Sequence, residues 1–301
     1  IAIIGVLAAV LLPVLSQAKA KAKRVKCVGQ LGQIGKAFIG CAQDYDDRLP
    51  WQLTPAQSRG AFGEYGDDFA MDHAAMFSLP SIRHDLATAA ILLSPCDPGR
   101  APANEKAQEQ WSKIDLLQGH MLPADAISYV LIDGADVARP GTVLATTRNL
   151  STCNLRTARW SGADGPGPET MAGLQRSQGQ IMLADGSARL SSDADLSETG
   201  PLIRDHDQSG GGTYKGPAPT VVLGCGGEPD PLESSPLEPG ELFQVIQSGK
   251  GNRYVFVIDC SGSMNCDGRL SMAKSELIAA ILSMEPDKEF FIYYYNHDSI
   301  P

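Results

Sequence analysis

The chain has 301 residues, of which 43% are hydrophobic and 20% charged, with a mean hydropathy of -0.12. This composition excludes a disordered chain and a membrane protein with several spans, and the length suits about two domains. The net charge of -10 is uneven, because the first 26 residues carry +5 and no acid, which leaves -15 on the rest. An acidic body repels phosphate backbones, so the sequence disfavours nucleic-acid binding.

The chain begins with an apolar segment. Residues 1–18 (IAIIGVLAAVLLPVLSQA) carry no charge. As a helix, the fully apolar part Ile1–Leu15 would span roughly 22 Å against the ~30 Å hydrocarbon core of a bilayer, so a membrane span would need about five more residues upstream. A basic collar (Lys19, Lys21, Lys23, Arg24 and Lys26) follows, and a basic cluster beside an apolar segment favours contact with lipid headgroups.

The helix is expected to continue after the collar. Apolar residues recur there at steps of three and four, which is typical of a helix with one buried face. They are Val28, Leu31, Ile34, Ala37, Phe38 and Cys41. We expect this helix to end between Asp44 and Arg48.

The first fifty residues resemble the type IV pilin and type II secretion pseudopilin family. The likeness is carried by an apolar half-helix with Gly5 and Pro13, followed by an amphipathic half that ends in an acidic turn with Tyr45. It implies prepilin-type cleavage and methylation just upstream, and a single-pass protein of the bacterial inner membrane whose globular part is periplasmic or extracellular. The positive-inside rule would instead place the collar in the cytoplasm. A secretory signal peptide is disfavoured, because no small-residue cleavage site separates the two halves.

Residues 49–200 predict a small α+β globular region. Residues 128–132 (SYVLI) and 142–147 (TVLATT) are expected strands, and residues 181–190 a hairpin that turns at Asp185 and Gly186. The region is similar to a pseudopilin subgroup with a histidine, nine residues and then Asp-Gly, although Gln175 stands at the histidine position. The residues 92–99 (LLSPCDPG) resemble the cysteine-proline loop of this subgroup.

No catalytic motif is found, so we expect no enzyme. The five histidines are scattered without a partner at triad or metal-ligand spacing, which favours structural or exposed roles. They are His73, His84, His120, His206 and His297. The seven cysteines form no CxxC pair, which disfavours a zinc site and leaves the redox compartment open.

A linker is predicted over residues 201–241. Within 209–240, 17 of 32 residues are Gly, Pro or Ser, a composition typical of flexible and semi-rigid connections. Domain boundaries therefore follow: a membrane-anchoring pilin-like helix at 1–48, a globular region at 49–200, the linker at 201–241 and a second domain at 242–301.

The second domain begins with a predicted βαβ unit. Residues 253–259 (RYVFVID) and 289–295 (EFFIYYY) read as buried strands, with an amphipathic helix between them. Asp259, Ser261 and Ser263 place three oxygen side chains in the loop after the first strand, where ligands of parallel sheets collect. Such hard oxygen ligands suit Mg²⁺. Capping of the following helix by the same polar residues is the alternative.

The sequence VFVIDCSGSM resembles the von Willebrand factor A (VWA) domain, whose metal-ion-dependent adhesion site has the motif DxSxS. The resemblance implies a Rossmann-like α/β domain with Asp259, Ser261 and Ser263 as metal ligands, while its later threonine and aspartate ligands would follow residue 301. A protein partner would then supply a carboxylate to the metal.

Together, these features predict a membrane-anchored pilin-like subunit that displays a metal-dependent, adhesion-type VWA domain. Its partners would be the membrane, other pilin-like subunits and a protein ligand. The alternative is a structural pseudopilin of a type II secretion or filament system, whose VWA part serves only assembly contacts.

Overall fold

The computed structural model describes residues 2–63, 72–163, 165, 169–197, 199–212, 217–225, 253–259, 277 and 289–295. The chain divides into an N-terminal unit, Ile1–Asp230, and a C-terminal unit, Pro231–Pro301. Each unit is described by itself below.

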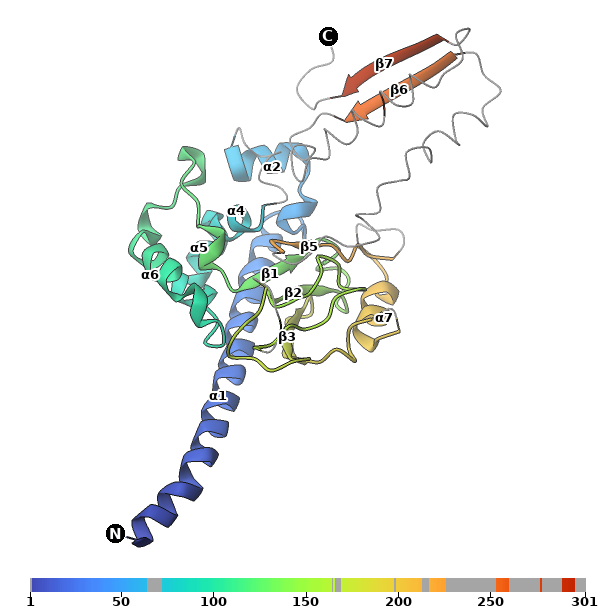
Figure 1. Cartoon of the computed structure of the whole chain (residues 1–301). Coiled ribbons are helices and arrows are strands. Elements are labelled where there is room, and N and C mark those ends of the chain that lie inside the picture. The colour runs from blue at the N-terminus through green and yellow to red at the C-terminus, as the bar shows by residue number, and fades with distance from the viewer. Residues whose placement is uncertain are drawn as a thin grey trace. The chain divides into compact units, whose positions relative to one another are not determined.

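A single long helix begins the N-terminal unit. Helix α1 runs over Ala2–Gln43 with Pro13 inside it, and its 42 residues extend about 63 Å at 1.5 Å per residue. It ends one residue before the expected range, in a turn where Asp46 and Asp47 adopt positive φ angles of 57° and 60°. Aspartate tolerates this left-handed conformation better than most residues, which explains why the chain reverses there. The predicted long N-terminal helix is confirmed (Figure 1).

A five-stranded antiparallel sheet forms the centre of the unit, in the order β4-β3-β2-β1-β5. The strands are β1 (Tyr129–Ile132), β2 (Val143–Thr147), β3 (Gly179–Leu183), β4 (Ala188–Ser191) and β5 (Val222–Leu223). The two predicted strands and the predicted hairpin are confirmed, and Gly186 supplies the positive φ of 90° that the hairpin turn needs. The mixed α+β class is therefore confirmed for this unit.

Short helices fill the connections. They are α2 (Pro55–Phe62), α4 (His73–Ser78), α5 (Pro80–Leu86), α6 (Ala101–Glu109) and α7 (Pro201–Gln208). Single 3-10 turns lie at Pro50–Gln52, Ala89–Leu92, Pro98–Arg100, Trp111–Lys113, Leu116–Gln118 and Ala124–Ala126. Local chemistry fixes the helix starts, since Thr54 caps α2 in a reciprocal pair with Gln57 and Asp72 caps α4.

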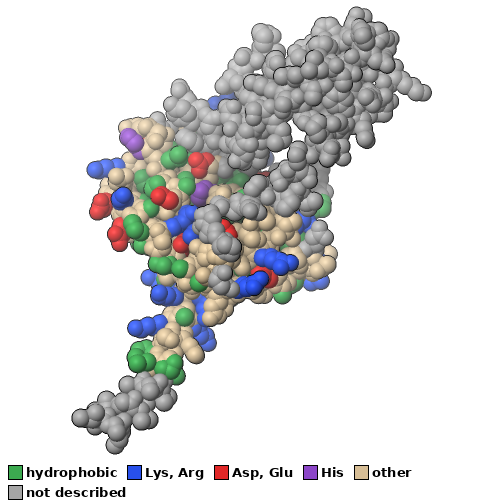
Figure 2. Space-filling model, viewed as in Figure 1, with side chains coloured by type: hydrophobic (Ala, Val, Ile, Leu, Met, Phe, Trp, Pro, Cys, Tyr) green, Lys and Arg blue, Asp and Glu red, His purple; other side chains and the backbone are tan. Residues whose placement is uncertain are grey.

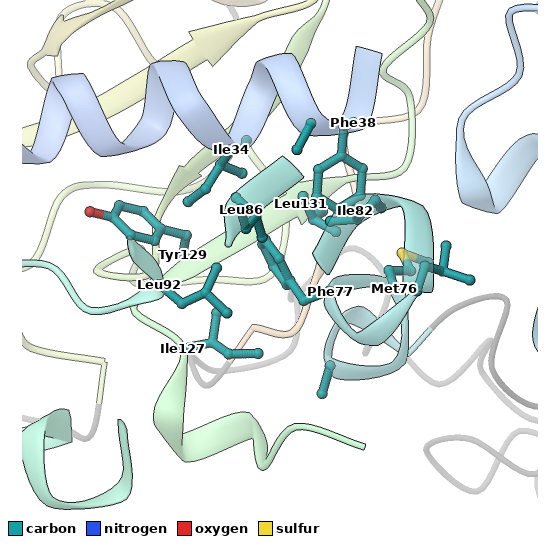
Figure 3. Close-up of a cluster of buried hydrophobic side chains, with 14 of the residues drawn as sticks. Ile34, Phe38, Met76, Phe77, Ile82, Leu86, Leu92, Ile127, Tyr129 and Leu131 are labelled. Carbon is teal, nitrogen blue, oxygen red and sulfur yellow. The ribbon is translucent and has the colours of Figure 1, made fainter. Parts of the chain in front are cut away.

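Both faces of the sheet are buried. Because side chains alternate along a strand, Tyr129 and Leu131 of β1 face one core, while Val130 and Ile132 face another. The first core joins the sheet to α1, α4 and α5 and includes Ile34, Phe38, Phe77, Ile82 and Leu86 (Figure 3). The second core contains Trp160 and the apolar side of α7. The C-terminal half of α1 therefore packs as a structural element of the fold.

The predicted linker differs from the structure over its first part. Residues 201–208 form α7, which buries Leu202, Ile203 and His206, and β5 pairs with β1. A disulfide joins Cys153 to Cys225. Gly224, with a positive φ of 82°, turns the chain directly after the short edge strand β5, and the two units divide after Asp230.

In the C-terminal unit, strands β6 (Arg253–Asp259) and β7 (Glu289–Tyr295) have the bounds that the sequence predicts. They pair in parallel, from Arg253 opposite Glu289 to Asp259 opposite Tyr295. Leu277, in the expected crossover helix, is helical and buried. A parallel pair requires a long crossover connection, and the residues between 259 and 289 supply it.

Candidate functional site

Helix α1 divides into two parts with different surroundings. We call residues 11–26 the arm and residues 27–43 the packed half. In the arm, Leu11, Leu12, Val14 and Leu15 are 52–67% exposed. The packed half buries Leu31, Ile34 and Phe38 completely. The arm projects from the globular body, with apolar side chains toward its end and Lys and Arg side chains nearer the body (Figure 2).

The apolar side chains of the arm form a contiguous exposed patch. Burying one such side chain is worth roughly 1.5–3 kcal/mol, so leaving four of them in water forgoes a substantial gain. Contiguous exposed patches of this kind mark surfaces that bind other apolar matter. The arm therefore presents an apolar surface to its surroundings.

The basic side chains of the arm separate this patch from the globular body. Lys19, Lys21, Lys23 and Lys26 have no acidic neighbour in the first 26 residues, and Arg24 reaches the body through a hydrogen bond from Nη1 to Oε1 of Gln178, 3.1 Å long. A row of ammonium groups beside an apolar surface matches the anionic headgroup layer that borders a hydrocarbon core.

Polar contacts hold the base of the arm to the body. Gln30, near the start of the packed half, donates through Nε2 to the carbonyl oxygens of Ala90 and Leu93, at 3.2 and 3.0 Å. Its Oε1 accepts the hydroxyl of Tyr129 at 3.0 Å. Burial raises the pKa of Tyr129 well above its ordinary value, so this hydroxyl stays a donor. The network fixes the direction in which the arm leaves the body.

A buried ion pair lies behind this network. Arg148, directly after β2, donates from Nε and Nη2 to the two carboxylate oxygens of Asp97, at 2.7 and 2.9 Å. Arg100 lies 3.8 Å from the same carboxylate, and burial lowers the pKa of Arg100 to about 10. One carboxylate thus bridges two guanidinium groups, which favours a structural role. Asp97 and Arg148 are 51 residues apart, and no local sequence pattern marked them as partners.

The two buried histidines are also structural. In His206, Nδ1 accepts the backbone N–H of Val143 at 3.0 Å and Nε2 donates to the carbonyl of Pro219 at 2.9 Å, which requires the neutral ring. Burial lowers the pKa of His206, and it lowers the pKa of His73 to about 4. The structural role that the sequence predicted for these two histidines agrees with their contacts.

Of the three predicted metal ligands, one lies in the described part of the chain. Asp259 is the last residue of β6, at the carboxyl end of the parallel pair, which is where such sheets bind ligands. Ser261 and Ser263 lie outside the described residues. Within the residues that are described, no group of three or more His, Cys, Asp or Glu side chains is placed to hold a metal ion.

Among the helices of the described residues, none is both long enough and apolar enough to cross a membrane. Comparison of the chain with protein-family models, with curated proteins and with solved structures gives no match.

Proposed function

We propose that this chain is a pilin-like subunit that associates with the bacterial inner membrane through α1 and displays a metal-dependent, VWA-type protein-binding domain. One observation carries the proposal: the same continuous helix has an exposed apolar and basic arm and a packed half with a buried apolar face. A helix with no lipid or helix partner for its arm would gain nothing from exposing four large apolar side chains.

The resemblance of the first fifty residues to pilins adds the expected arrangement. In it, the apolar segment that contains Gly5 and Pro13 enters the lipid, and the arms of other copies pack beside it. The globular body then stands outside the inner membrane. The collar lies at the headgroup layer, where each basic side chain contributes about 1 kcal/mol to binding of anionic lipid.

The C-terminal unit supports the second half of the proposal. Asp259 ends a strand of a parallel pair, and the DxSxS motif would add Ser261 and Ser263 as further oxygen ligands. Mg²⁺ held by one carboxylate and two hydroxyls keeps coordination positions for water or for a carboxylate from a partner. The displayed domain would therefore bind an acidic side chain of another protein.

Vesicle flotation tests the membrane half. We expect the full chain to float with phosphatidylcholine vesicles that contain phosphatidylglycerol, less with phosphatidylcholine alone, and less at high salt. Leu12→Asp places a charge in the apolar patch and should weaken binding on the order of 10–100-fold. Leu190→Asp is the matched control, because Leu190 is 53% exposed on β4 of the body. Equal binding of the two variants would overturn the membrane assignment.

Calorimetric titration of the same protein with Mg²⁺ tests the second half. Asp259→Ala should abolish the binding heat, whereas Asp267→Ala, eight residues later in the sequence and outside the motif, should preserve it. Mg²⁺ binding that is unchanged in Asp259→Ala would favour the alternative, in which the C-terminal unit serves only assembly contacts.

A further inference from the structure

Two cysteines meet where the arm joins the body. Cys27 is fully buried and directly follows the exposed side chains of the arm. Cys96 lies in the loop before the turn Pro98–Arg100 and is also fully buried. The two belong to one small cluster with Met171 and Leu174, and both are thiols in the structure.

The contacts around the two sulfurs place them side by side. Ser94 contacts both residues, since its Oγ lies 2.8 Å from Cys27 Sγ and accepts the backbone N–H of Cys96 at 3.1 Å. The two residues thus share Ser94 as a neighbour within one buried cluster. A disulfide between them would require the two sulfurs to approach to about 2 Å.

The backbone at Cys96 is held in place for this contact. Gly173 donates its N–H to the carbonyl of Cys96 at 2.8 Å. A Cβ on Gly173 would come within 2.6 Å of the Cα of Cys96, so a glycine is needed for this close approach. On the other side, Gln30 fixes α1 one turn after Cys27. The loop and the helix are therefore both positioned before any covalent bond forms.

We infer that Cys27 and Cys96 are oxidised to a disulfide that ties the base of the arm to the loop before α6. A separate observation supports an oxidising environment: the N-terminal unit already contains the Cys153–Cys225 disulfide, and structural disulfides persist in the periplasm and outside the cell. The assignment does not depend on the proposed function, since it concerns only the two thiols and their surroundings.

The chemistry is a thiol–disulfide exchange with a disulfide of an oxidoreductase as the oxidant. The neighbouring Cys96 side chain, aided by Ser94 and opposed by burial, lowers the pKa of Cys27 to about 7, while Cys27 and burial raise the pKa of Cys96. The Cys27 thiolate attacks the donor disulfide and releases one donor thiolate. Cys96 then loses its proton and attacks the Cys27 sulfur of the mixed disulfide, which releases the second donor thiolate. Two cysteine protons and two electrons thus pass to the donor, which leaves as a dithiol.

The bond would connect the arm to the centre of the sheet. Asp97, next to Cys96, is paired with Arg148 at the end of β2. A pull on the arm would reach the sheet through a covalent link and a buried ion pair, in addition to the apolar packing of α1.

Peptide mapping tests the inference directly. The full chain is produced in a bacterial periplasm, unfolded without reductant, alkylated and digested with trypsin. We expect a linked pair of residues 27–36 with 84–100, beside the linked pair 149–156 with 216–250, which reports the Cys153–Cys225 disulfide. Residues 37–48, which contain Cys41, should be alkylated. Alkylated Cys27 and Cys96 beside an intact second link would overturn the inference, as would a link from Cys27 to any other cysteine.

Unfolding of variants gives an independent readout. All three tryptophans, Trp51, Trp111 and Trp160, lie in the N-terminal unit and report its denaturation. Without reductant, Cys27→Ser, Cys96→Ser and the double variant should lower the unfolding midpoint by the same amount, because each breaks the same bond. Cys41→Ser, at a buried thiol that accepts a hydrogen bond from Ser81, is the matched control and should shift equally with and without reductant. Additive effects of the two single variants would contradict a bridge.

Discussion

The two halves of α1 share one backbone and one set of hydrogen bonds, yet their sequences follow different rules. The packed half spaces its apolar residues to meet the sheet and the short helices, and it buries most of them. The arm has apolar residues in succession, followed by a run of cations, and none of its large apolar side chains is buried. Both halves are therefore helical, and they differ in what their side chains contact.

The origin of helicity also differs between the halves. An isolated helix of the arm's length would be marginal in water, because nucleation is costly. The arm continues a helix that the packed half already nucleates, and its Ala, Leu and Lys residues have high helix propensity. The packed half thus supports the arm, while the arm contributes nothing to the core of the body.

The largest difference should appear when the same truncation is made in each half. Leu31→Ala removes a fully buried side chain from the packed half and should cost about 2–5 kcal/mol of the free energy of unfolding. Leu12→Ala, in the arm, should change it by less than about 0.5 kcal/mol. Denaturant titration followed by tryptophan fluorescence measures both.

The two variants should exchange their ranking in vesicle flotation, where Leu12→Ala weakens binding and Leu31→Ala does not. A Leu12→Ala variant that destabilises the body as much as Leu31→Ala would show that the arm folds back onto the body, and the division of α1 would be wrong.

Sequence patterns predicted this division because it is local. Apolar spacing, charge and the Asp185-Gly186 turn each specify their structure within a few residues, and the strands at 253–259 and 289–295 were predicted with their observed bounds. The contacts that fix the base of the arm were not predictable in the same way. Gln30 with Tyr129, Asp97 with Arg148 and Cys153 with Cys225 join residues 51 to 99 positions apart, and their pairing exists only once the chain has folded.

The segment 201–225 shows a different limit. Its Gly and Pro content is typical of a linker, whereas α7 and β5 belong to the fold. The apolar pattern here is too short to outweigh the Gly and Pro content. Helix α7 has two buried apolar residues on a single turn, and β5 is an edge strand of only two residues. The disulfide at Cys225 supplies the stability that such short elements lack.

Acid should lower the stability of the body through a group that the arm lacks, with an effect smaller than that of Leu31→Ala. Burial lowers the pKa of His73 to about 4. The Asp72 carboxylate opposes this shift, and the Arg100 cation adds to it. As the pH falls, the unfolded chain binds a proton at His73 before the folded chain does. The free energy of unfolding therefore has its full value above pH ~6.5 and decreases by up to about 3 kcal/mol as the pH falls to about 4. The arm carries no His, Asp or Glu, so only the body responds.

The pH dependence of the unfolding free energy measures this effect. His73→Gln should flatten the curve between pH 6.5 and 4, and His84→Gln, at an exposed position on α5, should leave its slope unchanged. Equal slopes in the parent protein and His73→Gln would contradict the assignment of the acid response to His73.

The smallest effect concerns two glycines of the packed half that face different surroundings. A Cβ on Gly29 would meet nothing within 4 Å, whereas a Cβ on Gly35 would come within 2.7 Å of Met182 Cγ on β3. Alanine is favoured over glycine in a helix by about 0.8–1.0 kcal/mol, so Gly29→Ala should stabilise the N-terminal unit by up to that amount. Gly35→Ala gains the same propensity but must displace Met182 from the core, and should be neutral or destabilising by about 1–3 kcal/mol. If both variants stabilised the unit equally in denaturant titrations, the close packing of α1 on β3 would be contradicted, and the packed half would resemble the arm more closely than its burial indicates.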